Sequence, residues 1–320
     1  MKRIKNTVTK LGSRRRPSQT KSKKEYPKLS DKTLTNYAKN YARFFENGAE
    51  IGEPHKQFFL DKPVSTRLNY IWSVMRAHKV FGDGDLPSWV DEMEKSSKEE
   101  LKVYYNEQKK SKKEGENWIS LKELQKYNKS QRTALSAITN KFTNMEMGTQ
   151  KRALMRDWLI TSLYVLDPVN HPPMRVDYNM KIVNWFKGYD EDQETGNYLK
   201  ITNKSTKHFV FNDYKTSGAY GTKKIKLSKK MNAMMNIYLK YHPDNKYLFG
   251  KDENISKNAL QKKVIGAFAG TGKTLGVSML RHIVISDTVD TGDKLKEKAE
   301  LAEKMGHSVT SQEIYKKFDE

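Results

Sequence analysis

The sequence predicts a mainly α-helical protein with a small antiparallel β-sheet, an α+β fold. Over most of the chain beyond Leu29, apolar residues recur at intervals of three and four, the spacing of one face of an α-helix. Alternating apolar and polar residues, typical of half-buried strands, are confined to residues 180–227. The chain has 320 residues, enough for two domains, and contains no apolar stretch long enough to span a membrane.

The first 27 residues are expected to form a basic disordered arm. Residues 2–24 contain ten Lys or Arg and no acidic residue, and they show no apolar periodicity. Arg14, Arg15 and Arg16 lie at the centre of this stretch and are candidate DNA-binding residues, because contacts to phosphates release counterions. The same residues would suit a nuclear-localisation signal, and the sequence leaves both readings open.

Residues 28–94 are predicted to form a small helical DNA-binding domain. Ser30 or Asp31 is placed to cap a first helix, and a second helix is expected after Pro63. The apolar positions of the two helices are Leu34, Tyr37, Tyr41, Phe44 and Phe45, then Leu68, Ile71, Trp72 and Met75. Basic residues lie on the other faces, which suits DNA but equally suits an ordinary solvated helix surface.

Residues 95–117 are almost all polar and are interpreted as a partly helical linker. The second domain, residues 118–320, opens with a capping-box pattern, Ser120-x-x-Glu123. Helices are expected around Leu135–Met145 and Leu154–Val165, and later over 229–241, 257–268, 276–288 and 293–305. Strands are expected over 180–185, 198–202 and 208–213, followed by a hairpin through the glycine-containing turn 217–221.

Composition points to a polyanionic partner. The formal net charge is +22 and the isoelectric point about 9.7, so nucleic acid is the expected ligand. The absence of cysteine excludes disulfides and Cys-ligated metals, and the seven histidines show no paired spacing. No metal site and no cofactor are predicted. With no signal-peptide pattern at Met1, an intracellular location is expected rather than secretion.

Five residues of the second domain have the side chains that phosphoryl transfer requires: Arg175, Lys215, Arg281, His307 and Tyr315. Two guanidinium groups can hold a phosphodiester, a lysine or histidine can protonate a leaving oxygen, and a tyrosine hydroxyl can attack without a metal. Taken one at a time, each of the five has an ordinary structural explanation, and their local motifs are what single them out.

The motifs around these residues resemble those of tyrosine recombinases, the phage-integrase family. Leu280-Arg281-His282, Met305-Gly306-His307-Ser308 and a tyrosine eight residues after His307 are similar to the C-terminal signature of that family. The stretch 172–178, Pro-Pro-Met-Arg-Val-Asp-Tyr, resembles the segment of its first arginine, and Tyr-Lys-Thr at 214–216 resembles that of its lysine. The residues of these segments are most similar to those of recombinases from eukaryotic DNA viruses and related mobile elements.

This resemblance implies a helical core-binding domain and a catalytic domain that together clamp double-stranded DNA. Tyr315 would be the nucleophile that forms a 3′-phosphotyrosyl link. Arg175 and Arg281 would bind the phosphate, Lys215 would be the general acid, and His307 would donate to a non-bridging oxygen. Neither ATP nor a metal is implied, and self-association as a dimer or tetramer on DNA is expected.

The chain departs from the family pattern in two places. The family commonly has a histidine three residues before its second arginine, where this chain has Ser278. His171 and His282 are the candidates to replace that group, although His282 is better explained as a hydrogen-bonded residue that orients the site. Only five residues follow Tyr315, little for the C-terminal helix that many relatives dock onto a neighbouring subunit.

The segment 267–274, Ala-Phe-Ala-Gly-Thr-Gly-Lys-Thr, fits a loose phosphate-binding loop. A nucleotide-binding domain would need further parallel strands after it, and no strand-rich sequence follows. The segment is therefore interpreted as a glycine-rich turn before the Arg281 helix, with Lys273 close to DNA phosphate.

Three functions remain open at the level of sequence. The first is site-specific recombination or integration. The second is a topoisomerase-like or telomere-resolving activity that uses the same five residues, and the third is a DNA-binding relative without catalytic activity. Strand exchange between two duplexes would distinguish the first from the second, and a covalent adduct would exclude the third. The target sequence and the direction of the reaction cannot be derived from these residues.

Overall fold

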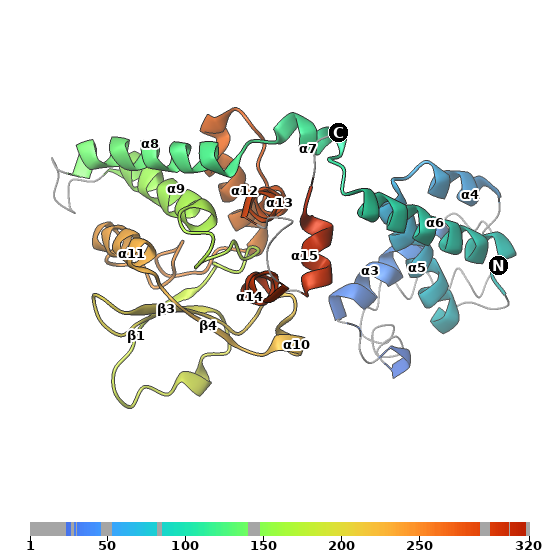
Figure 1. Cartoon of the computed structure of the whole chain (residues 1–320). Coiled ribbons are helices and arrows are strands. Elements are labelled where there is room, and N and C mark those ends of the chain that lie inside the picture. Colours follow the sequence, from blue (N-terminus) through green and yellow to red (C-terminus); the bar gives the residue numbers. More distant parts are fainter. Residues whose placement is uncertain are drawn as a thin grey trace. The chain divides into compact units, whose positions relative to one another are not determined.

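The computed structural model describes residues 24–26, 29, 31–45, 53–81, 85–139, 148–288, 295–306 and 308–317. The chain divides into two compact units, Met1–Glu107 and Gln108–Glu320 (Figure 1). The predicted arm with Arg14, Arg15 and Arg16 lies outside the described residues, and so does His307. The division falls inside the segment for which a linker was predicted.

Unit 1 is a cluster of four described helices. They are α3 (Asp31–Phe45), α4 (Glu53–Leu60), α5 (Val64–Phe81) and α6 (Ser88–Glu107). Helix α5 lies at the centre and contacts the other three. The core of unit 1 contains the buried residues Tyr41, Phe59, Ile71, Val74, Ala77, Trp89, Val90 and Met93. The predicted helices near 31–45 and after Pro63 are present, and α6 extends the unit through most of the predicted linker.

One arginine on the expected basic face of unit 1 has a structural role. Arg67 pairs with Glu100 at 2.7 Å and donates to the backbone carbonyl of Phe59 at 3.3 Å. Its guanidinium therefore joins the end of α4 to α6. These bonds within the unit fix the position of the Arg67 side chain, without any contact to DNA.

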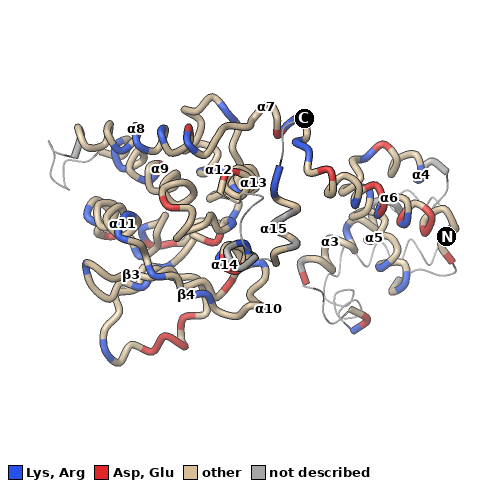
Figure 2. Tube along the Cα trace, viewed as in Figure 1, with Lys and Arg blue, Asp and Glu red and all other residues tan. Residues whose placement is uncertain are grey.

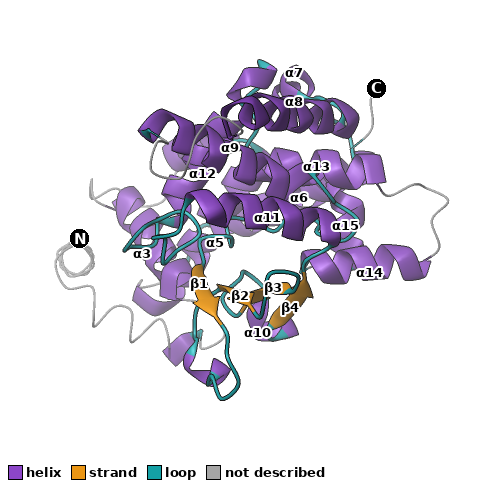
Figure 3. Cartoon of the chain, turned by 90° about the vertical axis from the view of Figure 1, so that its left-hand side faces the viewer, coloured by secondary structure: helices purple, strands orange, loops and turns teal. Residues whose placement is uncertain are grey.

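Unit 2 is built around one buried helix, α9 (Thr149–Val165). From Trp158 to Val165 every residue of α9 is buried, as expected for a helix that is covered on all sides. Its neighbours include α8 (Leu121–Thr139), α11 (Lys229–Tyr241) and α12 (Lys257–Ala267). Figures 1 and 3 show these helices gathered on one side of the unit, with the sheet below them.

Unit 2 contains five further described α-helices. They are α7 (Lys112–Asn117), α10 (Ser217–Tyr220), α13 (Val277–Thr288), α14 (Leu295–Met305) and α15 (Val309–Tyr315). The predicted Ser120 capping box is confirmed, since the Ser120 hydroxyl accepts from the Glu123 amide at 3.2 Å and Glu123 accepts in return. Helices α4 and α15 were not predicted.

The sheet contains four described strands in the order β1-β2-β3-β4. They are β1 (Lys181–Asn184), β2 (Tyr198–Ile201), β3 (Lys207–Phe211) and β4 (Lys223–Lys226). Strands β2, β3 and β4 pair antiparallel, and the predicted β3–β4 hairpin is present. The expectation of a wholly antiparallel sheet is wrong, because β1 pairs parallel to β2. The mainly helical α+β class itself is confirmed.

The two faces of the sheet bury different residues, as the alternation of side chains along a strand requires. Leu199, Phe209 and Phe211 join the main core of unit 2, in which α9 lies. Val183, Tyr198 and Val210 form a smaller cluster on the other face. The hairpin thus rests on the helical core, and its connection, residues 212–222, is fixed relative to that core.

Charge is distributed unevenly along unit 2 (Figure 2). Between β1 and β2, residues 190–194 contain four acidic residues, among them Glu191 and Glu194, which pair with the strand lysines Lys200 and Lys181. Lysine and arginine predominate on the tube near α8 and α11. Two of the four acidic residues of this connection are thus paired with lysines of neighbouring strands.

Candidate active site

A small cavity in unit 2 brings together side chains from five separate segments of the chain. Its volume is about 150 Å³, and it is lined by Met174, Arg175, Asp177, Tyr214, Lys215, Thr216, Arg281, Met305, Gly306, Ser311 and Tyr315. Four of the five predicted catalytic residues are in this lining. The fifth, His307, cannot be placed, but its neighbour Gly306 lines the cavity.

Arg175 is held by the loop that follows α9. The hydroxyl of the buried Tyr164 donates to the Arg175 carbonyl at 3.0 Å. The Arg175 guanidinium donates from Nη2 to the Tyr315 hydroxyl at 2.9 Å, although 140 residues separate the two. A cation and a potential nucleophile are therefore in direct contact.

Arg281 approaches the same phenol from α13. It is buried, its Nη1 donates to the carbonyl of Pro173, and its Nε has no hydrogen-bond partner within the described structure. Its guanidinium carbon lies 5.6 Å from the centre of the Tyr315 ring. Burial, together with the charge of Arg175, lowers the pKa of Arg281 to about 10, which leaves it cationic at neutral pH. Two guanidinium groups beside one phenol form a site suited to a phosphate.

Lys215 lies in the β3–β4 connection, between two anchored neighbours. The Tyr214 hydroxyl donates to the Gly221 carbonyl at 2.8 Å. The Thr216 hydroxyl donates to the Gly306 carbonyl at 2.6 Å and so ties the hairpin to the turn after α14. Lys215 itself is exposed at the rim of the cavity. Its ammonium group can therefore reach a bound phosphodiester and supply a proton.

Tyr315 is the last residue of α15, and its ring belongs to a small apolar cluster. That cluster contains the buried Ile285 and Met305, with Leu301 and Tyr315 packed against them. Beyond the helix, the amide of Lys317 donates to the Ser286 hydroxyl at 2.9 Å. The nucleophile candidate is thus placed by packing against α13 and α14.

His282, the residue after Arg281, also contacts the Tyr315 ring. The two ring centres are 5.0 Å apart with an interplanar angle of 66°, an edge contact. The Nδ1 of His282 lies 2.8 Å from the Glu114 carboxylate on α7. This hydrogen bond lowers the pKa of Glu114 to about 2, so its carboxylate is ionised at neutral pH. His282 was expected to orient the site, whereas Glu114 was not singled out from the sequence.

Asp177 is a second acidic residue that was not singled out, although it belongs to the quoted segment 172–178. It is buried in the cavity lining, and its Oδ1 lies 3.4 Å from the Lys257 Nζ. Burial raises the pKa of its carboxyl group, and Lys257 partly offsets this effect. Its position, two residues after Arg175, was the available signal.

The other residues named from the sequence lie away from the cavity. Ser278 is exposed in the first turn of α13, three residues before Arg281. His171 is buried, and its Nε2 accepts the Ser228 amide at 2.8 Å, so it supports the start of α11. Lys273 donates to the Glu116 carbonyl at 2.7 Å. Neither Ser278 nor His171 is in the lining, and Lys273 is engaged in a contact with α7.

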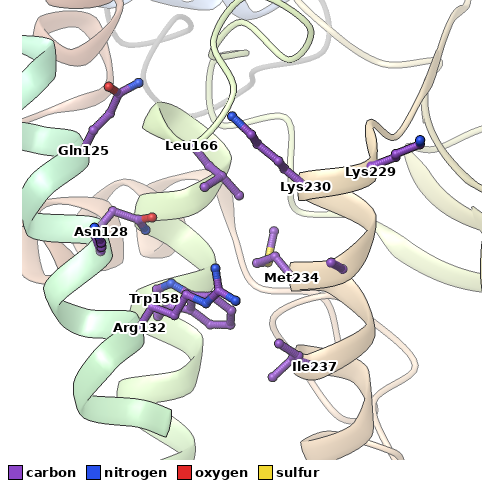
Figure 4. A pocket seen from close by; sticks show the side chains of 11 residues that line it. Gln125, Asn128, Arg132, Trp158, Leu166, Lys229, Lys230, Met234 and Ile237 are labelled. Carbon is purple, nitrogen blue, oxygen red and sulfur yellow. The ribbon is translucent and has the colours of Figure 1, made fainter.

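A larger cavity, of about 590 Å³, lies between α8, α9 and α11 (Figure 4). Its floor includes Trp158, Leu166 and Met234, and its basic residues are Lys129, Arg132, Lys229 and Lys230. Arg175, Lys215, Arg281 and Tyr315 are not in its lining. The smaller cavity is therefore the candidate active site.

In the described part of the chain, no group of three or more His, Asp or Glu residues is placed to hold a metal ion. No helix of these residues is both long and apolar enough to cross a bilayer.

This chain is similar to a solved structure. No protein-family model matches the chain, and no curated protein matches it. The crystal structure of XerA recombinase is similar to this chain with a TM-score of 0.35 and 14% sequence identity, over 94% of each chain.

Proposed function

We propose that this chain cleaves and rejoins double-stranded DNA through a phosphotyrosyl intermediate on Tyr315, as a site-specific recombinase or integrase. The observation that supports the proposal most directly is the position of the Tyr315 hydroxyl. It is hydrogen-bonded to Arg175, and the Arg281 guanidinium lies over the ring that carries it, in a cavity that also contains Lys215. The sequence motifs around these residues support the same chemistry.

In the proposed reaction, a DNA phosphate replaces solvent beside the two guanidinium groups. Arg175 and Arg281 bind its non-bridging oxygens and stabilise the charge that develops there. The Tyr315 oxygen attacks phosphorus and loses its proton to solvent, so that a Tyr–O–P bond forms as the P–O5′ bond breaks. Lys215 gives a proton to the departing 5′ oxygen, and His307 donates to a non-bridging oxygen.

Rejoining is the reverse of this step. A 5′ hydroxyl attacks the phosphotyrosine and releases Tyr315, and the bond energy is conserved throughout. Exchange between two duplexes would require the chain to act on DNA as a dimer or tetramer. A protein with this function would act inside a cell, together with its DNA.

The test is covalent trapping on nicked suicide DNA that carries candidate sites, in the presence of a chelator. The unmodified chain should form an adduct that resists denaturant. Tyr315→Phe should form none, because it keeps the ring and its packing but removes the attacking oxygen. Tyr220→Phe is the matched control, since Tyr220 is exposed on α10 and outside the cavity lining, and it should form the adduct normally.

Two results would contradict the proposal. One is an adduct that persists in Tyr315→Phe. The other is tight binding of cognate DNA by the unmodified chain with no adduct, which would support a non-catalytic relative and direct attention to Ser278. If the adduct forms, the products distinguish recombination of two duplexes from relaxation or end resolution of one.

A further inference from the structure

Helix α7 lies beside the residues that surround Tyr315, although it is far from them in sequence. Its residue Glu114 is hydrogen-bonded to His282, 168 residues away, and His282 contacts the Tyr315 ring. We infer that Glu114 is a positioning residue for Tyr315, acting through His282. This inference rests on the function proposed above, because it assigns a role in the same reaction.

The two oxygens of the Glu114 carboxylate have different partners. Oε2 accepts from the Ser111 amide at 2.9 Å and from the Ser111 hydroxyl at 2.8 Å, which forms the capping box of α7. Oε1 faces His282 Nδ1 at 2.8 Å. An ionised carboxylate can only accept hydrogen bonds, so His282 must carry a proton on Nδ1. Glu114 therefore fixes both the ring orientation and the tautomer of His282.

The fixed imidazole gives the Tyr315 ring a third neighbour besides the two arginines. Arg175 contacts the hydroxyl, Arg281 lies over the ring, and His282 meets the ring in a tilted edge contact at 5.0 Å. In-line attack depends on the placement of the nucleophile to a fraction of an ångström. Without the carboxylate, His282 would lose the bond that fixes its plane, and the Tyr315 ring would lose a defined neighbour.

Helix α7 has anchors that do not depend on Glu114. Lys273 donates to the Glu116 carbonyl at 2.7 Å, and the Thr274 amide donates to the Asn117 side chain at 2.7 Å. The glycine-rich turn of residues 269–274 thus serves as a docking point for α7. A change confined to the Glu114 carboxylate should leave the helix in place, which makes the positioning role separable from folding.

Glu114→Gln tests the inference because it preserves size but not acceptor capacity. A glutamine presents one oxygen and one NH₂ group. If its oxygen caps Ser111, its NH₂ faces His282 Nδ1, which must then accept and carry its proton on Nε2. If its oxygen faces His282, the Ser111 amide loses its acceptor, so the first arrangement is favoured and the tautomer of His282 changes. Glu116→Gln makes the same chemical change two residues along the same helix, where the side chain is exposed.

The first measurement is ¹⁵N NMR of the histidine rings in the full chain, with the His282 signal assigned through His282→Asn. The unmodified chain and Glu116→Gln should show the Nδ1-protonated tautomer, and Glu114→Gln should lose it. The second measurement is the single-turnover rate of adduct formation. Glu114→Gln should slow it on the order of tenfold, with DNA affinity close to that of Glu116→Gln and the chain still folded at the temperature of the assay.

A double-mutant cycle separates positioning from a general structural effect. Glu114→Gln should slow the reaction no further in a His282→Asn background, because both changes remove one connection. Equal adduct rates for Glu114→Gln and Glu116→Gln, or additive effects with His282→Asn, would overturn the inference while leaving the proposed function intact. Failure of the unmodified chain to form any adduct would overturn both, and an Nε2-protonated His282 in that chain would overturn the inference alone.

Discussion

At the scale of single residues, Glu114 gives a clear dependence of stability on pH. Its pKa in the folded chain is lowered from 4.5 to about 2, first by the hydrogen bond with His282. A lowered folded-state pKa contributes stability that is present above the unfolded pKa and is lost as the pH falls through the folded one. The relevant window therefore lies between about pH 4.5 and pH 2.

We predict that this contribution is on the order of 1–2 kcal/mol at pH 7, after allowance for solvent screening. Unit 2 of the unmodified chain should lose about that much more stability than Glu114→Gln when the pH falls from 6 to 2. Native-state hydrogen exchange of the α9 amides measures this free energy of unfolding. Identical pH profiles for the two proteins would contradict the assignment, and Glu116→Gln should follow the unmodified chain.

Residues with recognisable motifs could be predicted from the sequence, whereas Glu114, whose contact is distant in sequence, could not. Arg175, Lys215, Arg281 and Tyr315 were predicted from their local motifs, and the structure gathers them in one cavity. Glu114 was hidden in a polar stretch, and its partner lies 168 residues away. The pattern Ser111-x-x-Glu114 is that of a capping box, but no sequence rule indicates which distant residue a capping carboxylate will also bind.

At the scale of elements, the turn after α14 depends on a glycine. Gly306 has a φ of +72°, and a Cβ at this position would lie 3.1 Å from the Tyr214 ring and 3.3 Å from the Thr216 hydroxyl. We predict that Gly306→Ala destabilises the chain by about 1–3 kcal/mol, through backbone strain. It should also slow adduct formation, because the turn and the hairpin carrying Lys215 would move apart.

Thermal unfolding and covalent trapping measure these two effects. Gly266→Ala is the control, since Gly266 lies inside α12 and a Cβ there meets nothing within 4 Å. That substitution should raise stability by roughly 0.5–1 kcal/mol, as expected for glycine in a helix. A Gly306→Ala protein as stable and as active as the unmodified chain would show that this turn does not position the site.

Elements with a long periodic pattern were predictable, and short ones were not. The helices at 229–241 and 257–267 and the β3–β4 hairpin were predicted because their patterns are local. Helix α15 has seven residues and forms where Tyr315 packs against Ile285 and Met305, a tertiary cause that periodicity does not report. The parallel pairing of β1 with β2 was missed because alternation within a strand says nothing of direction.

At the scale of the whole molecule, the net charge of +22 should dominate DNA affinity. We predict that deletion of residues 1–27 weakens binding and makes it less sensitive to salt. Each lost phosphate contact should reduce the slope of log K against log salt by about 0.9. Fluorescence anisotropy between low and physiological salt measures the slope. An unchanged slope would exclude the arm from the interface, and an unchanged thermal midpoint would show that both units remain folded.

The division of the chain was predictable from composition, but its position was only approximate. The polar stretch 95–117 marked the change between units, whereas the structure divides after Glu107, because α6 continues through the polar residues. Buried Trp89, Met93 and Ser97 on one face hold α6 to unit 1. A helix whose exposed face is highly charged looks like a linker when only its composition is considered.

The shortness of α15 has a mechanical consequence for the proposed reaction. Isolated helices of fewer than roughly 12 residues are marginal in water, so these seven residues depend on their contacts with α13 and α14. Their amides should therefore exchange with solvent through local opening, well below the free energy that opens α9. A DNA 3′ end joined to Tyr315 would then be attached to a short helix that opens locally, and not to the rigid interior of unit 2. Local opening of α15 would let the broken end move a short way toward a second strand while the rest of the unit stays folded.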